Sequence, residues 1–214
     1  MRILIISDVH GNLPALEYVL EKEKDADLVV SLGDVVNYGP WSNECVDKLA
    51  SLDKKALIRG NHEEAFLSGK YPGDHPIAKT FFEYCYPHFS RKQEIAEYVD
   101  SFAYQGFDFV HTIGNSYIFP DSEVQLTGNT FIGHSHRMFK KEINGFTLVN
   151  VGSVGQNRVD PDEINYALWD TDSGISLVAR EFSADSLISE MRHRNYPEAC
   201  INYILSKRNK KNDQ

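Results

Sequence analysis

Cysteine is scarce in this sequence. Cys45, Cys85 and Cys200 lie far apart and form no pairing motif. An odd, scattered set of this kind argues against a disulfide framework and is typical of reduced thiols in a cytosolic protein. We therefore expect a cytoplasmic location.

Long hydrophobic runs are absent as well. The apolar run at residues 3–6 is too short for the core of a signal peptide, and Asp8 cuts it off. No run approaches the roughly 18 residues that a membrane span needs. The sequence therefore predicts no association with a membrane.

An excess of positive charge is also lacking. The 22 Lys and Arg residues are outnumbered by 31 Asp and Glu residues, which gives a formal net charge of -9. An acidic surface disfavours bulk electrostatic binding of nucleic acid, so we expect no duplex nucleic acid as a partner. An anionic substrate is still compatible, because a bound metal can reverse the sign of the field inside a cleft.

No internal repeat or low-complexity segment divides the 214 residues. This length suits one domain over residues 1–214 with a sizeable core, and we expect the polar tail at 207–214 to be frayed.

A βαβαβ rhythm opens the chain. Apolar runs at 2–6, 28–32 and 56–58 predict strands, and the helical patterns that begin near Leu13 and Asn43 separate them. Crossovers of this length predict parallel pairing and an α/β fold.

The rhythm changes at residues 63–104, which we interpret as a helical insertion beside or over a cleft. A helix is predicted at 90–102 with Ser90 as its cap. The aromatic stretch at 81–89 is compatible with internal packing or with a platform for stacking bases, and packing is favoured.

Strands return in the second half of the chain. Two are predicted at 107–110 and 130–132. Asn144 and Gly145 indicate a hairpin that joins 140–143 to 146–149. A second hairpin that joins 166–169 to 175–178, and a helix from about Ala184, complete the prediction.

Five of the apolar runs end in residues that can bind a metal: Asp8 with His10, Asp34, Asn61 with His62, His111, and His134 with His136. Ligands of open α/β sheets bind beyond the carboxyl ends of the strands, so these residues converge if the strands share a sheet. Asp8 and His10 point the same way if extended geometry continues to the end of the strand.

The chemistry of this set indicates more than one ion. Oxygen and imidazole ligands without thiolate suit Mn, Fe, Zn, Ni or Co. The set exceeds what a single ion needs. It fits two ions about 3.5–4 Å apart with a carboxylate between them, the arrangement used for phosphoester hydrolysis.

The order and spacing of these residues resemble the five motifs of the calcineurin-like metallophosphoesterases. Residues 33–40 and 150–156 are similar to extra signatures of the small bacterial and archaeal phosphodiesterase branch. The resemblance runs from Arg2 to about Arg158. It implies an α/β, four-layer sandwich of two mixed β-sheets flanked by helices.

The resemblance also implies a role for each motif residue. Asp8, His10 and His136 would hold the first metal, and Asn61, His111 and His134 the second. Asp34 would bridge two divalent ions, with Mn expected first. A hydroxide shared by the metals would attack phosphorus in line. His62, outside the metal shell, would stabilise the phosphoryl oxygens or protonate the leaving oxygen.

Contacts to the substrate are less specified. Thr112 follows His111 where the family more often has glycine, and Asn37 replaces a small residue, which leaves local substrate contacts open. Arg158 is a candidate phosphate clamp. Residues 152–155 could present amides to a phosphate or pass as a turn close to the metal loops, and we favour the turn. Arg59 is expected to face away.

The implied function is hydrolysis of a small phosphodiester or phosphomonoester. A nucleotide-type substrate is favoured because the insertion would narrow the cleft. The alternative is a non-catalytic scaffold of the same fold that binds a partner protein, as the retromer subunit does. Such scaffolds lose ligands or the active-site histidine, whereas all eight positions are intact here. The sequence leaves the natural substrate and the oligomeric state open.

Overall fold

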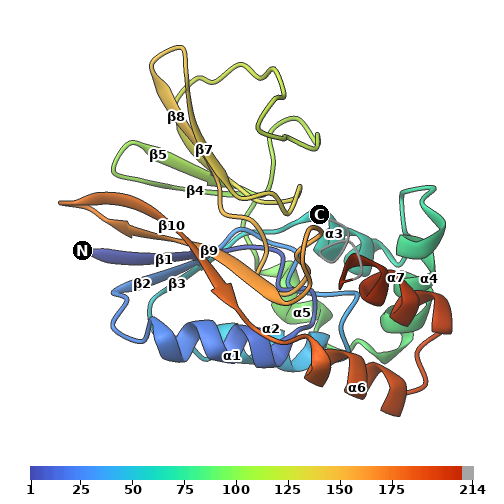
Figure 1. Cartoon of the computed structure of the whole chain (residues 1–214). Helices are drawn as coiled ribbons and strands as arrows, with labels where there is room; N and C mark the ends of the chain where they lie inside the picture. Colours follow the sequence, from blue (N-terminus) through green and yellow to red (C-terminus); the bar gives the residue numbers. More distant parts are fainter. Residues whose placement is uncertain (209–214) are drawn as a thin grey trace.

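The computed structural model describes residues 1–208, and the chain forms two five-stranded mixed sheets that face each other (Figure 1). The first sheet has the order β10-β9-β1-β2-β3. Its strands are β1 (Arg2–Ile6), β2 (Leu28–Ser31), β3 (Lys55–Leu57), β9 (Glu163–Asp170) and β10 (Gly174–Glu181). β1, β2 and β3 are parallel, whereas β9 runs antiparallel to β1 and β10 antiparallel to β9.

The second sheet has the order β4-β5-β6-β8-β7. Its strands are β4 (Ser101–Tyr104), β5 (Phe107–Val110), β6 (Asn129–Ile132), β7 (Phe139–Ile143) and β8 (Phe146–Asn150). β5, β6 and β8 are parallel, and both predicted hairpins are confirmed as the antiparallel pairs β7–β8 and β9–β10.

Helices cover the outer face of the first sheet. They are α1 (Leu13–Lys22), α2 (Ser42–Ala50), α3 (Asn61–Ser68), α4 (Pro76–Cys85), the 3-10 turn η1 (Tyr86–His88), α5 (Lys92–Ala96), α6 (Asp185–His193) and α7 (Glu198–Arg208). In Figure 1, α1 and α2 lie beneath this sheet and α3, α4 and α7 gather at one end of it. None of the helices within residues 1–208 is both long enough and apolar enough to cross a membrane.

The alternation of β1 explains why its sequence is apolar throughout. Ile3 and Ile5 are fully buried between the two sheets, whereas Leu4 and Ile6 are fully buried against the helices. A strand that is covered on both faces has no polar side, so the run is continuous rather than alternating. The predicted α/β fold with two mixed sheets is therefore confirmed.

The outer face of the second sheet has a different cover. Ile118 and Leu126, from the non-helical segment 112–128, pack there against Ile132 and Leu148. This segment also carries Tyr117, which reaches the site described below.

The predicted helix at 90–102 is wrong in most of its length. Only Lys92–Ala96 is helical, and Ser101–Tyr104 is the edge strand β4. Ser90 does not cap the helix, because its amide and hydroxyl both donate to Asn43 Oδ1. The Val99 backbone is drawn into a parallel bridge with Ile58, so pairing with the sheet overrides the local helical pattern.

The aromatic stretch at 81–89 packs internally, as favoured from the sequence. Phe81, Phe82 and Phe89 are buried in the core on the helical side of the first sheet. The tail at 207–214 was predicted to be frayed, but Lys207 and Arg208 are the last residues of α7. Arg208 forms ion pairs with Asp162 and Asp185. Residues 209–214 lie outside the described residues.

Candidate metal centre

The loops that follow the parallel strands are tied to one another by main-chain hydrogen bonds. Asp8 N–H donates to the Gly33 carbonyl and His10 N–H donates to the Asp34 carbonyl, so the first two motif loops run side by side. In the second sheet, Gly133 N–H donates to the His111 carbonyl in the same way. The predicted convergence at the carboxyl ends of the strands is therefore observed.

Close approach between these loops requires glycine. A Cβ added at Gly60 would lie 2.2 Å from Asp34 Oδ1, and one at Gly133 would lie 2.6 Å from Asp8 Oδ2. Both distances are shorter than any van der Waals contact, so the glycines that precede Asn61 and His134 let the loops meet.

The backbone of the site is left-handed rather than extended. Five motif residues have positive φ: Asp8 (54°), His10 (46°), Asp34 (55°), His134 (65°) and His136 (57°). The expectation that extended geometry continues from β1 through Asp8 and His10 is therefore wrong, since β1 ends at Ile6. Left-handed backbone is uncommon outside glycine, and Asp, Asn and His tolerate it best.

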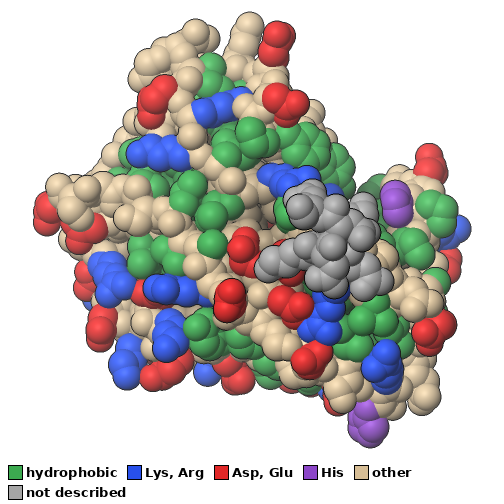
Figure 2. All heavy atoms as spheres, viewed as in Figure 1, with side chains coloured by type: hydrophobic (Ala, Val, Ile, Leu, Met, Phe, Trp, Pro, Cys, Tyr) green, Lys and Arg blue, Asp and Glu red, His purple; other side chains and the backbone are tan. Residues whose placement is uncertain are grey.

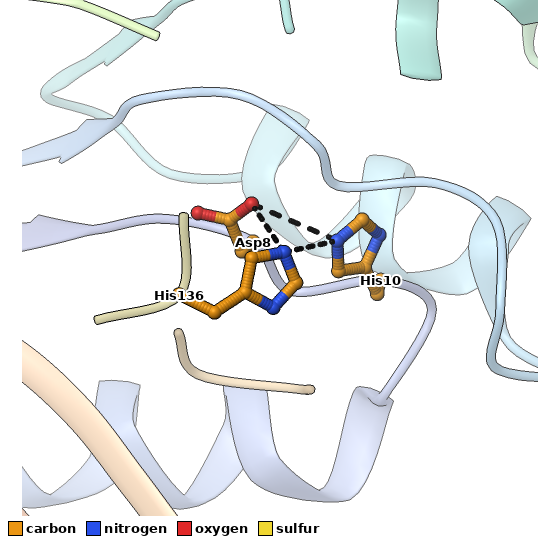
Figure 3. Close-up of side chains that lie close together, drawn as sticks. All are labelled: Asp8, His10 and His136. Atoms are coloured by element: carbon orange, nitrogen blue, oxygen red, sulfur yellow. Dashed lines mark hydrogen bonds and ion pairs between the residues drawn. The ribbon is translucent and has the colours of Figure 1, made fainter. Parts of the chain in front are cut away.

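Asp8, His10 and His136 form a first cluster (Figure 3). Asp8 Oδ1 lies 3.1 Å from His136 Nε2 and 3.6 Å from His10 Nε2, and the two Nε2 atoms are 3.3 Å apart. All three side chains are buried. One carboxylate oxygen and two imidazole nitrogens therefore converge on a single point.

A second cluster forms around Asp34, His111 and His134. His111 Nε2 lies 3.2 Å from Asp34 Oδ2, 3.1 Å from His134 Nδ1 and 3.1 Å from Asn61 Oδ1. The Asp34 Oδ2 atom also lies 4.0 Å from His10 Nε2 in the first cluster. Asp34 thus stands between the two clusters.

Each carboxylate is oriented by a main-chain amide. Asp8 Oδ2 accepts the His134 N–H at 3.0 Å, and Asp34 Oδ1 accepts the His62 N–H at 2.9 Å. The remaining oxygen of each group faces imidazoles. Asp8 Oδ1 is buried with no hydrogen-bond donor of its own.

Three histidines are oriented by main-chain carbonyls. The Nδ1 atoms of His10, His111 and His136 contact the carbonyls of Val36 (3.1 Å), Leu32 (2.9 Å) and Gln156 (2.5 Å) respectively. An Nδ1 that donates to a carbonyl leaves the lone pair on Nε2, which here points into the clusters. Lone pairs and carboxylate oxygens that face one another at these distances require a cation between them, so the residues fit divalent metal ions.

Burial and neighbouring charges shift the titration of these groups. Burial would raise the pKa of Asp8, but His136 and His10 outweigh it and hold this pKa well below its usual range. Burial lowers the pKa of His134 and of His136 to about 4. Burial also opposes charge on His111, yet Asp34 raises the pKa of His111 to about 10.

His62 forms a third group with His10 and Asp34, next to the two clusters. The Asn37 side-chain amide donates to His62 Nδ1 at 2.9 Å, and His62 Nε2 is 4.0 Å from Asp34 Oδ2. Nδ1 is thereby an acceptor, so Nε2 carries the proton in the neutral ring. Burial lowers the pKa of His62 to about 3.

The predicted substrate contacts divide into those near the site and those away from it. Asn37 contacts His62, and Arg158 lines the same cavity as His62. Arg59 turns away, as expected, and donates to the Ala96 and Tyr98 carbonyls. The Val154 and Gly155 amides donate to the Ser7 and Asp8 carbonyls, so residues 152–155 form the turn that we favoured and these two amides do not face a phosphate.

The structural role of Glu63 was not predicted from the sequence. Its buried carboxylate accepts the N–H groups of Asp34, Val35, Val36 and Gly60 and so fastens the Asp34 loop to the start of α3. Burial raises the pKa of Glu63, and nearby Asp34 adds to the effect. The signal was available, since an acid three residues after Gly60 is a helix-capping pattern.

Known proteins share this fold and parts of this sequence. Residues 1–208 match the calcineurin-like phosphoesterase family. An uncharacterized protein of Methanocaldococcus jannaschii is 28% identical over 92% of this chain and 94% of its own length. A stretch covering 19% of this chain and 23% of the phosphodiesterase YfcE of Escherichia coli is 50% identical. A metallophosphoesterase from Sphaerobacter thermophilus superposes with a TM-score of 0.75 and 25% identity over 96% of this chain and 98% of that one.

The chain therefore belongs to the calcineurin-like phosphoesterase family. It is a phosphoesterase with buried aspartate and histidine clusters that can hold divalent metal.

Proposed function

We propose that the chain is a dinuclear metal-dependent hydrolase of small phosphodiesters or phosphomonoesters. Asp8, His10 and His136 would hold one ion, and Asn61, His111 and His134 the other. Asp34 would be shared. The observation that carries this proposal is the position of Asp34 Oδ2, within 3.2 Å of His111 in one cluster and 4.0 Å of His10 in the other.

Manganese is the first candidate for both ions, with Fe, Zn, Ni and Co as alternatives, because the donors are oxygen and imidazole without thiolate. Two bound ions supply Lewis acidity, which lowers the pKa of water and neutralises charge on the phosphoryl oxygens. The chain itself supplies orientation, since main-chain groups hold both carboxylates and three imidazoles before any ion binds.

His62 would act on the leaving group. Its Nε2–H is directed by the Asn37 amide and lies near the shared carboxylate. From there it can donate to a phosphoryl oxygen or to the departing oxygen. The low pKa of His62 means that the ring is neutral at pH 7, so its Nε2–H acts on either oxygen as a hydrogen-bond donor.

A small substrate is supported by the insertion. Tyr71, Asp74 and Ile77 line the cavity that contains His62, so the insertion closes one side of the approach. The three cysteines are buried and unpaired, which supports a reducing compartment such as the cytoplasm.

The rival hypothesis is a metal-free scaffold that binds a partner protein. The complete donor set and the buried Asp8 Oδ1 without a donor argue against it, because an unfilled cluster of this kind would be costly to keep.

The deciding experiment combines metal analysis with a substrate panel. Purified protein reconstituted with Mn²⁺ is expected to bind two ions per chain and to hydrolyse aryl phosphate mono- or diesters. Asp34→Asn should lower both the metal content and the turnover. The matched control is Asp108→Asn, which changes a carboxylate on β5 away from both clusters. Protein that holds no metal and cleaves none of the esters would refute the proposal in favour of the scaffold.

A further inference from the structure

A cavity of about 490 Å³ adjoins the metal centre. It is bounded by His62 and Arg158 on the side of the metal ligands and by residues 71–78 of the insertion. Its volume falls within the range of about 300–1,000 Å³ that is typical of sites for small organic ligands. A single phosphate group would occupy only part of it.

Aromatic rings dominate the wall of this cavity. Tyr38, Tyr71 and Tyr203 come from three separate parts of the chain, and Tyr117 and Phe119 come from the segment that covers the second sheet. Rings that are brought together from such distant positions offer several faces to a planar ligand.

Tyr117 and Phe119 are exposed although they are large and aromatic. Their relative exposures are 50% and 37%, and they are two of only five large hydrophobic side chains that are exposed among residues 1–208. The Tyr117 ring stacks on the His134 ring with centroids 4.0 Å apart, and the Phe119 ring is nearly parallel to Tyr117 at 13°. The rings of His134, Tyr117 and Phe119 thus form a row of roughly parallel faces, with 6.4 Å between the centroids of Tyr117 and Phe119.

Arg158 joins this aromatic row to the metal centre. Its guanidinium carbon lies 5.4 Å from the centre of the Tyr117 ring, and its Nε is buried without a hydrogen-bond partner. A buried guanidinium nitrogen with no acceptor is costly, and a phosphate or ribose oxygen would satisfy it.

We propose that this cavity binds the base of a nucleotide substrate. The base would stack on Tyr117 and Phe119, and Arg158 would contact the phosphate or ribose between the base and the metal centre. A nucleoside fits better than an aryl ester, because Asp74 and His75 also line the cavity and their polar groups suit ribose hydroxyls. This inference rests on the proposed phosphoesterase function.

Binding is tested with ligands that cannot be cleaved. The phosphonate analogues of adenosine 5′-monophosphate and of ribose 5-phosphate differ only in the base. Titrated by calorimetry into Mn²⁺-loaded protein, the adenosine analogue is expected to bind about tenfold more tightly, as stacking of one base on aromatic side chains provides.

Phe119→Ala should abolish this preference and leave the affinity for the ribose analogue unchanged. Within residues 1–208 the Phe119 ring stacks on Tyr117 and not on a proposed metal ligand, so metal content and the circular dichroism spectrum should match the wild type. Tyr18→Ala is the control, because Tyr18 lies on α1 and packs on Phe182 outside the cavity. It should keep the full preference.

Equal affinity of the two analogues in the wild type would overturn the inference, even if aryl esters are hydrolysed. Tighter binding of the phosphonate analogue of phosphotyrosine than of the nucleotide would overturn it as well. If instead no ester is cleaved but the base preference is present and lost in Phe119→Ala, the hydrolytic proposal fails and the base site stands.

Discussion

His62 differs from the other histidines of the site in its partner. A side-chain amide from Asn37 holds its Nδ1, whereas main-chain carbonyls hold His10, His111 and His136. We expect His62→Ala to lower kcat by about 10²–10⁴, the usual contribution of a positioned proton donor. Steady-state kinetics with an aryl phosphate ester measure this directly.

If His62 lies beside the ions rather than among their ligands, as proposed, the metal content of His62→Ala should remain near that of the wild type. His193→Ala is the control for loss of an imidazole, because His193 is exposed on α6. A His62→Ala enzyme with unchanged kcat would exclude His62 from the chemistry.

Three buried histidines make the metal-free protein sensitive to acid. The pKa values of His62, His134 and His136 fall to about 3, 4 and 4 in the fold, below the ordinary value of 6.5. Between pH 6.5 and 4 the unfolded chain binds up to three more protons at these sites, so the free energy of unfolding falls as the pH falls. His111 opposes this slope in part, because its raised pKa keeps it protonated in the fold while the unfolded residue takes up its proton near pH 6.5, but the three lowered pKa values outweigh this one group.

Thermal unfolding of chelated protein should therefore show a lower Tm at pH 5 than at pH 7. A His134→Gln variant, which removes one of the three groups, should have a shallower slope. A Tm that is flat or rises toward pH 5 would contradict this account.

At the residue level, the sequence indicated which residues form the site, but it gave the wrong backbone conformation for them. Asp8 and His10 were correctly expected to converge, but the reason given, extended backbone, was wrong. Period-two reasoning applies to strands and cannot reveal a left-handed turn. The position of Tyr117 beside the site could not be predicted from the sequence. Its contact with His134 depends on the path of a segment that has no helical or strand periodicity.

At the level of elements, Glu63 joins α3 to the Asp34 loop. Glu63→Gln replaces one accepting oxygen by an NH₂ group that would face backbone N–H donors. We expect the free energy of unfolding to fall by about 1–3 kcal/mol, the usual cost of unsatisfied buried polar groups. Metal affinity should weaken too, because the loop that carries Asp34 loses its anchor.

Urea denaturation and metal titration measure the two effects. Glu64→Gln is the matched control, since Glu64 is the next residue on α3 and its side chain is exposed. Equal stability of the two variants would show that Glu63 does not fasten the loop.

Strands with apolar cores were predicted well, and the helix at 90–102 was not. β5, β6 and both hairpins follow from alternation, apolar runs and the Asn144-Gly145 turn. The helix at 90–102 was predicted wrongly because the local helical pattern does not show that part of this segment pairs with neighbouring strands. Strand β4 exists because β5 offers it an edge, which is tertiary information.

At the scale of the whole molecule, metal should stabilise the fold. An ion that binds only the native state at 100 times its dissociation constant adds about 2.7 kcal/mol. For a protein of this size that corresponds to a Tm increase of about 5–11 °C. Differential scanning calorimetry with and without Mn²⁺ tests this, with Ca²⁺ as a comparison ion that prefers oxygen ligands. An unchanged Tm would argue that no ion binds.

The two-sheet sandwich as a whole came from the resemblance to a family and not from periodicity. Hydrophobic patterns place strands but do not say which sheet each joins, so β9 and β10 could not be assigned beside β1 from the sequence. On the face shown in Figure 2, acidic and basic side chains are intermixed.

The left-handed backbone at Asp8, His10, Asp34, His134 and His136 restricts how this centre can change during evolution. Most replacements would disturb the main chain and the ligand together. Glycine and asparagine keep the turn while removing the charge or the imidazole, and of the two only asparagine keeps a polar side chain. A descendant that has lost catalysis but keeps the fold is therefore expected to carry asparagine at these positions. Such asparagines would indicate that its ancestor held a metal centre.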